Sequence, residues 1–161
     1  MTKLYFCKDD KNAIIPAKRK EDAGYDVYML KTDEPIYIKP GETRLIDTGI
    51  KAAFSSDYVL LGRERGSTGT KGMRFGAGVI DSGYRGRIMI PINNTSDKTI
   101  ALAPEDYSIN DNNLIIYPQE KAIAQLLLIP VIHADVIEVN QGEYEEFTSE
   151  RGTGMLGSTN K

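Results

Sequence analysis

The stretch GVIDSGYRG, residues 78–86, is the most informative part of this 161-residue chain. Two β-branched apolar residues stand directly before a carboxylate, and two glycines flank the tyrosine that follows. This pattern predicts a short strand that ends in a tight turn, with Asp81 held at the strand end. A rigid strand end is a good position for a general base. A β-hairpin whose aspartate only closes its own turn has the same pattern, so the stretch by itself leaves both interpretations open.

Short runs of β-forming residues lie on both sides of this stretch, separated by turn signals such as Pro40-Gly41, and one of the runs extends around Thr48-Gly49. Runs of this length and spacing are typical of β-sandwiches and barrels. The sequence therefore predicts one all-β domain. The predicted strands lie at 36–38, 45–50, 58–61, 88–92 and 114–117.

The second half of the chain is harder to interpret. Residues 120–128 are good helix formers, but the apolar runs 129–132 and 136–139 that continue them favour strands throughout. The segment 93–113, rich in Asn, Asp, Ser and Thr, is predicted to be a loop excursion or an added hairpin. A glycine-rich polar tail cannot build a core and is either disordered or closes over something. We therefore expect a β-domain over 1–147 and a mobile C-terminal arm over 148–161.

Composition excludes several classes of function. The formal net charge is −3, so no overall basic field draws the protein to nucleic acid, and no direct nucleic-acid binding is expected. Cys7 and His133 are the only cysteine and histidine, which argues against a disulfide framework, a Cys/His zinc site and a Ser/His/Asp triad. The polar N-terminus and the lack of a long apolar run predict no signal peptide and no membrane association. We expect a cytoplasmic protein, or a nuclear or host-cytoplasmic one if its source is eukaryotic or viral.

Four other places carry polar groups in arrangements that chemistry could use. Asp26 follows a small pair and a tyrosine at an apparent strand start, where an ordinary turn aspartate is the simpler interpretation. Residues 62–72 combine arginines, hydroxyls, glycines and a lysine, the parts of either a phosphate cradle or a solvated turn, without the order of a P-loop. Gln125 lies in an apolar strand, where burial would demand a partner. The tail RGTGMLGSTN, 151–160, adds an arginine and further hydroxyls.

In order and spacing, these five segments resemble the five sequence motifs of the trimeric dUTP diphosphatase (dUTPase) family. AGYD at 23–26 looks like motif one, 62–72 like motif two, GVIDSGYRG at 78–86 like motif three, IAQL at 123–126 like motif four, and RGTGMLGSTN at 151–160 like motif five. The resemblance implies a distorted jelly-roll or β-clip-like barrel that forms a homotrimer with a swapped C-terminal arm. It also implies active sites at the subunit interfaces, each built from motifs of three chains.

The same resemblance implies hydrolysis of dUTP to dUMP and pyrophosphate, which limits uracil in DNA and supplies dUMP for thymidylate synthesis. Asp81 would activate a water for attack on the α-phosphorus, and Gln125 would lie near that water. Tyr84 would pack against the deoxyribose and leave no room for a 2′-hydroxyl. Mg²⁺ would be the cofactor, bound through the substrate phosphates and water, with Asp26 in its outer shell.

Further residues would bind the substrate. The hairpin backbone would pair with the uracil edge, the motif-two loop would hold phosphate oxygens, and the closing tail would cover the uracil and the γ-phosphate. The residues implied for these contacts are Gly78, Ile80, Arg65, Gly66, Ser67, Arg151, Leu156, Gly157, Ser158 and Thr159.

The chain departs from the family pattern in its phosphate loop and its tail. Motif two usually continues from arginine to serine, whereas Gly66 follows the arginine here, so Ser67 would have to supply the hydroxyl, or the register of the loop differs. Motif five usually carries a phenylalanine, but Leu156 takes its place, and the stacking contribution of roughly 1–3 kcal/mol is lost unless another ring replaces it. Phe75 and Phe147 are the two candidates for that ring.

The segment 93–113 exceeds the common family length and is a candidate surface for a protein partner. Two other functions compete with dUTP hydrolysis. One is a non-catalytic nucleotide-binding or regulatory protein that keeps the fold while motifs two and five drift. The other is dCTP deamination on the same fold, which needs an additional glutamate base and an extended N-terminal region that the sequence does not show.

Overall fold

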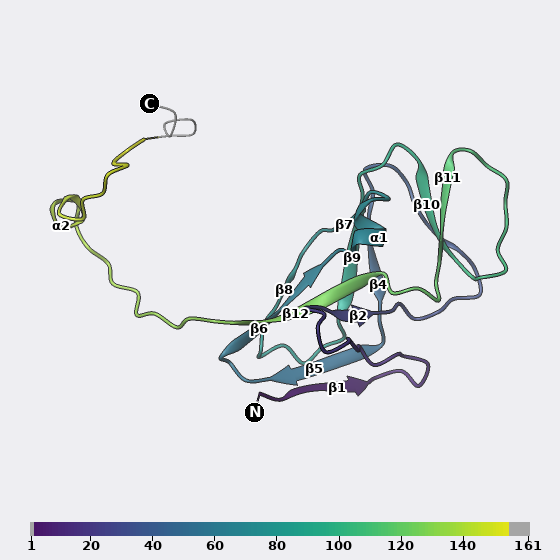
Figure 1. Ribbon diagram of the computed structural model, residues 1–161, viewed down its shortest axis with the longest axis horizontal. Coiled ribbons are helices and arrows are strands. Elements are labelled where there is room, and N and C mark those ends of the chain that lie inside the picture. The colour runs from purple at the N-terminus through teal and green to yellow at the C-terminus, as the bar shows by residue number, and fades with distance from the viewer. Residues whose placement is uncertain (1, 155–161) are drawn as a thin grey trace.

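Short strands in four small sheets form the body of the protein in the computed structural model, which describes residues 2–154 (Figure 1). All strand pairs within the described part of the chain are antiparallel except β10 with β11. The all-β prediction is therefore confirmed. The sheets are β1 (Leu4–Lys8) with β5 (Ile50–Phe54); β11 (Leu114–Pro118), β10 (Thr99–Ala103) and β3 (Ile36–Ile38); β2 (Tyr25–Val27), β12 (Ala124–Pro130), β6 (Tyr58–Arg63) and β8 (Val79–Ile80); and β4 (Thr43–Asp47), β9 (Met89–Asn94) and β7 (Met73–Phe75).

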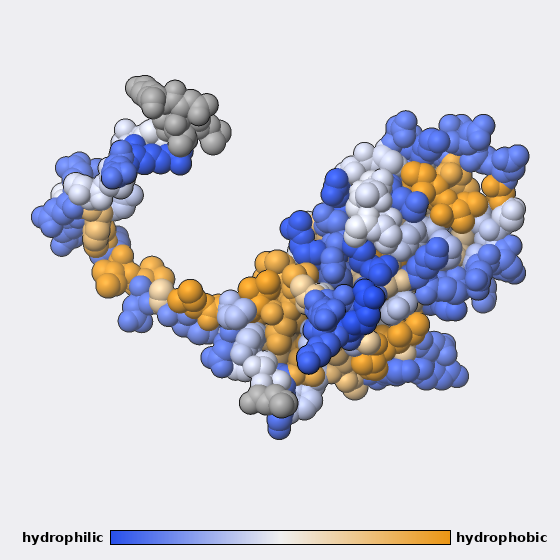
Figure 2. Space-filling view, in the orientation of Figure 1, coloured by the Kyte–Doolittle hydropathy of each residue, from blue (hydrophilic) through white to orange (hydrophobic). Residues whose placement is uncertain are grey.

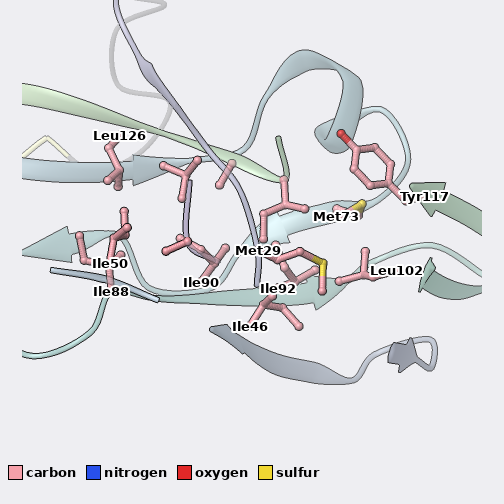
Figure 3. Close-up of a cluster of buried hydrophobic side chains, with 14 of the residues drawn as sticks. Met29, Ile46, Ile50, Met73, Ile88, Ile90, Ile92, Leu102, Tyr117 and Leu126 are labelled. Atoms are coloured by element: carbon pink, nitrogen blue, oxygen red, sulfur yellow. The ribbon is translucent and has the colours of Figure 1, made fainter. Parts of the chain in front are cut away.

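One hydrophobic core joins the sheets. Every second residue of a strand points to the same face, and in β5 the alternate residues Ile50, Ala52 and Phe54 are the buried ones. Figure 3 shows how side chains from several strands meet in this core. Its largest fully buried members include Ile38, Ile46, Leu60, Met73, Ile88, Ile90, Ile92, Ile100, Leu102, Tyr117 and Ile123.

Most predicted strands are confirmed: 36–38, 58–61, 88–92 and 114–117 correspond to β3, β6, β9 and β11, and the ambiguous apolar segment forms β12. The single strand predicted over 45–50 is wrong. Gly49 has a φ of 65°, a left-handed conformation that suits glycine, and the chain turns there from β4 into β5 of another sheet. The buried Thr48 hydroxyl fixes this turn by donating to the Ile88 carbonyl oxygen at 2.6 Å.

The prediction of a loop or added hairpin over 93–113 is also wrong for its first half. β10 runs through it as the middle strand of its sheet, parallel to β11 and antiparallel to β3, and its Ile100 and Leu102 are fully buried. This five-residue strand was not predicted because it is short and lies between polar segments. Outside the strands are the turn 95–98 and the longer loop 104–113, so a partner surface on this segment, which stays a prediction, would have those two stretches fully outside the sheet.

Beyond β12 the chain leaves the body as an extended segment that leads to a short helix, α2 (Gln141–Glu145), set apart from the sheets (Figure 1). The strand predicted at 136–139 is wrong, because no part of 131–140 pairs with a strand of the described chain. His133 is likewise outside any strand, and its Nε2 lies 3.0 Å from the Ser56 carbonyl oxygen. No helix within residues 2–154 is long and apolar enough to cross a membrane.

Replacing Leu102 with alanine is expected to lower the free energy of unfolding by about 2–5 kcal/mol, because it opens a cavity in the core beside β3 and β11. Ile109, half exposed in the 104–113 loop, is the matched control, and its alanine variant should change stability by less than about 0.5 kcal/mol. Urea unfolding of all three proteins at one concentration measures both effects. Equal losses for the two variants would contradict a core role for β10.

Candidate active site

Residues from the predicted motifs one, two and four line one cleft of about 730 Å³, here called the phosphate cleft. Three separate elements meet there: β2, the loop after β6, and β12, which pairs with both β2 and β6. The sheet therefore brings together polar groups that are far apart in the sequence. The lining residues are Ala17, Lys18, Arg19, Asp22, Ala23, Gly24, Asp26, Arg65, Gly66, Ser67 and Gln125.

Asp26 and Arg65 form a two-point ion pair in the wall of this cleft. Arg65 Nε lies 2.8 Å from Asp26 Oδ1, and Nη2 donates to Oδ2 at 3.1 Å. Both side chains are about one third exposed, and Arg65 Nη1 also donates to the Ala122 carbonyl oxygen at 3.3 Å. Paired hydrogen bonds of this kind fix the plane of a guanidinium. Asp26 thus acts as the partner that orients Arg65, which the simple turn interpretation did not foresee.

Gln125 lies opposite Asp26 in the sheet register and has the partner that its position in an apolar strand demands. Its Nε2 donates to the Glu64 carbonyl oxygen at 2.9 Å. A Cβ on Gly24 would stand 2.4 Å from Gln125 Oε1, so the side chain lies directly over the glycine of the AGYD segment. The glycine therefore makes room for the glutamine at the cleft.

The loop after β6 contains a one-turn helix, α1 (Gly66–Gly69), and its two hydroxyl residues face different ways. Thr68 is buried, and its hydroxyl accepts from the Arg65 amide at 2.9 Å. Ser67 is exposed, lines the phosphate cleft and lies 3.4 Å from Arg65 Nη1. Of these two hydroxyls, the one available to a ligand in the cleft is that of Ser67.

Asp81 and Tyr84 line a second cleft of about 280 Å³, here called the hairpin cleft, together with Ile80 and Phe75. Asp81 follows β8 directly, and the Tyr84 amide donates to its carbonyl oxygen at 3.0 Å, so the predicted strand end and turn are confirmed. The Asp81 side chain is exposed, and its carboxylate makes no hydrogen bond or ion pair with residues 2–154. It is therefore a charged acceptor with no protein partner in the described chain.

Close backbone contacts explain the glycines that precede this hairpin. The Gly62 amide donates to the Gly78 carbonyl oxygen at 2.7 Å, and a Cβ on Gly78 would stand only 2.9 Å from the Gly62 oxygen. Phe75 covers Gly62, where a Cβ would lie 2.4 Å from its ring. Of the two candidate rings, Phe75 lines the hairpin cleft, whereas Phe147 lies exposed just after α2, beside Tyr144 of that helix.

The two clefts have no lining residue in common. Within one chain, therefore, no single cleft holds Asp81 together with Arg65 and Gln125. Arg151 lies beyond α2, where its Nε donates to the Gly154 carbonyl oxygen at 3.0 Å (Figure 1). The remaining predicted tail residues Leu156, Gly157, Ser158 and Thr159 lie outside the described residues.

Sequence reasoning missed several charged residues at the two clefts. Lys18, Arg19 and Asp22 line the phosphate cleft, where Arg19 Nε lies 2.9 Å from Asp22 Oδ2. Arg87 lines the hairpin cleft. The available signals in the sequence were the charged run KRKED, residues 18–22, directly before AGYD, and the arginine that directly follows GVIDSGYRG.

Comparison with solved structures identifies the fold. The structure of the Staphylococcus bacteriophage 80alpha dUTPase with dUpNHpp matches with a TM-score of 0.77 and 25% identity over 97% of each chain. A second structure of that dUTPase, its Y84F mutant, matches with a TM-score of 0.76 and 26% identity over 97% of each chain. The protein is thus a jelly-roll-like β protein of the class that includes these phage hydrolases.

Sequence comparison then gives the family. The dUTPase family model matches residues 10–106. A deoxyuridine 5′-triphosphate nucleotidohydrolase of Nautilia profundicola is 34% identical over 99% of both chains. Another, of Paraburkholderia xenovorans, is 36% identical over 80% of this chain and 77% of its own. The chain belongs to the dUTPase family of enzymes.

Proposed function

We propose that this protein hydrolyses dUTP to dUMP and pyrophosphate, with Asp81 as the general base. The observation that carries the proposal is the unpartnered Asp81 carboxylate, exposed at a strand end beside Tyr84 in a cleft. A carboxylate without a protein partner is available to hold and deprotonate a water, a contribution of about 10²–10⁴ in rate. The names of the relatives support the substrate, as does the phage structure with dUpNHpp.

In this mechanism the phosphate cleft holds the triphosphate and Asp81 removes a proton from the attacking water. Arg65, oriented by Asp26, would bind phosphate oxygens with its remaining N–H groups, and Ser67 would supply the hydroxyl that follows the arginine in relatives. Gln125 would help to orient the water. Attack on the α-phosphorus forms dUMP and expels pyrophosphate.

The hairpin would recognise the nucleoside. Tyr84 would pack against the deoxyribose, and backbone groups around Gly78 and Ile80 would pair with the uracil. Phe75, in the same cleft, is the candidate to replace the aromatic ring absent from the tail.

We propose a homotrimer in which each site combines the phosphate cleft of one chain with the hairpin cleft of a neighbour. Two features support it. The clefts share no lining residue, and the extended segment exposes Ile132, Val136 and Ile137 at 92%, 98% and 77%. Figure 2 shows apolar surface along the segment that leaves the body. Contiguous exposed apolar residues of this kind mark interaction surfaces, and the arm 148–161 would reach a third chain from there.

Mg²⁺ would enter with the substrate. Residues 2–154 hold no group of three or more His, Cys, Asp or Glu side chains suited to a metal ion, and both Asp26 oxygens contact Arg65. The cleft therefore fits a Mg²⁺ ion that is coordinated by the substrate phosphates and water, as is usual at phosphate sites. Asp26 would then be at most in the outer coordination shell. When bound, the ion would neutralise charge on the triphosphate. The exposed thiol of Cys7 suits a reducing compartment such as the cytoplasm.

Pyrophosphate release from dUTP, UTP, dCTP and dTTP in the presence of Mg²⁺ tests the proposal. The expected result is rapid turnover of dUTP, with turnover of the other three nucleotides slower by orders of magnitude. Ammonia release from dCTP would instead indicate a deaminase, and tight dUTP binding without turnover at high protein concentration would indicate a non-catalytic nucleotide-binding protein. Either result would overturn the proposed activity.

A further inference from the structure

Arg87 directly follows the segment 78–86, and its guanidinium lies between two carboxylates from other parts of the chain. Its Nε donates to Asp9 Oδ2 at 2.6 Å and its Nη1 to Asp47 Oδ2 at 2.7 Å. Asp9 follows β1, and Asp47 is the last residue of β4. All three side chains are about one third exposed. Arg87 therefore ties the end of the hairpin to two separate parts of the body.

The backbone around this ion-pair network is held as firmly as the side chains. Asp47 Oδ1 accepts from the Gly49 amide at 2.8 Å, and the Gly49 carbonyl oxygen accepts from the Asp9 amide at 2.8 Å. The Ile88 amide donates to the Ile50 carbonyl oxygen at 2.8 Å. The turn between β4 and β5 thus binds the Asp47 carboxylate and the Asp9 backbone, and Ile50 after it binds the residue next to Arg87, so the Arg87 backbone has little freedom.

Tyr84 takes its orientation from that backbone. Its hydroxyl donates to the Arg87 carbonyl oxygen at 2.9 Å. Its ring lies against Gly86, where an added Cβ would stand 2.3 Å from the phenol oxygen and 2.6 Å from Cζ. The ring is half exposed, and no other hydrogen bond links its hydroxyl to residues 2–154. The position of Arg87 therefore decides where the ring stands.

We propose that Arg87, held by Asp9 and Asp47, is a positioning residue that keeps Tyr84 against the substrate sugar and so sets the discrimination of dUTP from UTP. The inference rests on the proposed function, in which Tyr84 occupies the space of a 2′-hydroxyl. The Tyr84 ring can exclude a 2′-hydroxyl only if it is held in place. A shift of the ring by about 1 Å is enough to alter such a site. An arginine suits this task because its planar guanidinium bonds two carboxylates in fixed directions, which lysine cannot do.

Asp9 and Arg87 both have pKa values that keep them ionised at neutral pH. Hydrogen bonds from Lys51 and then Arg87 hold the pKa of Asp9 below its usual value, and hydrogen bonds to Asp9 and then Asp47 raise the pKa of Arg87. The preference for dUTP over UTP that the Tyr84 ring provides should therefore be constant at pH values near neutrality.

The test compares kcat and KM for dUTP and UTP in the full-length wild type, Arg87→Met and Asp47→Asn. The asparagine keeps an oxygen for the Gly49 amide and removes only the charge that faces Arg87. We expect the ratio of kcat/KM for dUTP to that for UTP to fall about tenfold in each variant, mainly because UTP is accepted better. The double variant should lose no more than Arg87→Met alone, because Arg87→Met already removes the ion pair that Asp47→Asn breaks.

Arg44→Met is the matched control. Arg44 forms a surface ion pair with Glu42 at 2.6 Å and lines neither cleft, so its loss should leave the ratio unchanged. Thermal unfolding distinguishes the positioning role of Arg87 from a purely structural one. A purely structural role would lower the stability of the variants without altering the ratio of kcat/KM values. An unchanged ratio in Asp47→Asn, an isosteric change that preserves the fold, would overturn the inference. A wild type that does not hydrolyse dUTP would instead refute the proposed function.

Discussion

Asp81→Asn is expected to lower kcat for dUTP by about 10²–10⁴, the usual contribution of a general base. The amide cannot accept the proton of the attacking water, yet it has nearly the same shape. Because the Asp81 carboxylate has no partner within residues 2–154, its neutralisation leaves no buried charge unpaired. The fold and the binding of a non-hydrolysable dUTP analogue should therefore survive. A single-turnover assay beside a binding titration measures both properties.

Asp97→Asn provides the control for this experiment. Asp97 is exposed in the turn between β9 and β10, so the same chemical change there should leave kcat as in the wild type. If Asp81→Asn keeps wild-type turnover, Asp81 is not the base. If it loses analogue binding as well as turnover, the residue serves binding rather than proton transfer.

Mixed trimers are expected to recover activity from two inactive proteins. Asp81→Asn damages only the hairpin cleft, and Arg65→Met damages only the phosphate cleft. If each site combines clefts of two chains, a refolded one-to-one mixture forms intact sites wherever an Asp81→Asn chain supplies Arg65 and an Arg65→Met chain supplies Asp81. Random assembly makes about one quarter of the sites intact.

The assay is dUTP turnover after joint unfolding and refolding, compared with each variant refolded alone. Gln125→Leu in place of Arg65→Met gives the same result by an independent route through the phosphate cleft. Activity no higher than that of the separate variants, in a mixture shown to contain both chains in one oligomer, would mean that each site lies within one chain.

Local sequence predicted the segments of the site better than the contacts between them. The strand end at Asp81 follows from a local pattern, namely apolar residues before a carboxylate and a glycine turn after it. The Asp26–Arg65 pair joins residues 39 positions apart, and the Asp9–Arg87 pair joins residues 78 apart. Such pairs depend on the sheet order, which no single stretch of sequence encodes.

Strand β10 was not predicted for a related physical reason. Its partners β3 and β11 are distant or parallel, so no tight hairpin turn marks it in the sequence. The break at Gly49 was missed because alternation alone does not reveal that the two halves of 45–50 join different sheets. The exposed apolar residues of 131–139 were predicted as a strand because, within one chain, apolar runs are expected to be buried.

The separation of the two clefts has a genetic consequence if the sites form between chains. A chain that lacks Asp81 still offers an intact phosphate cleft to a normal neighbour, while its own faulty hairpin spoils only one site. Each faulty chain therefore inactivates only one active site of the oligomer. In a cell that makes both versions, lost activity should rise in simple proportion to the share of faulty chains, so such alleles should behave as recessive rather than dominant.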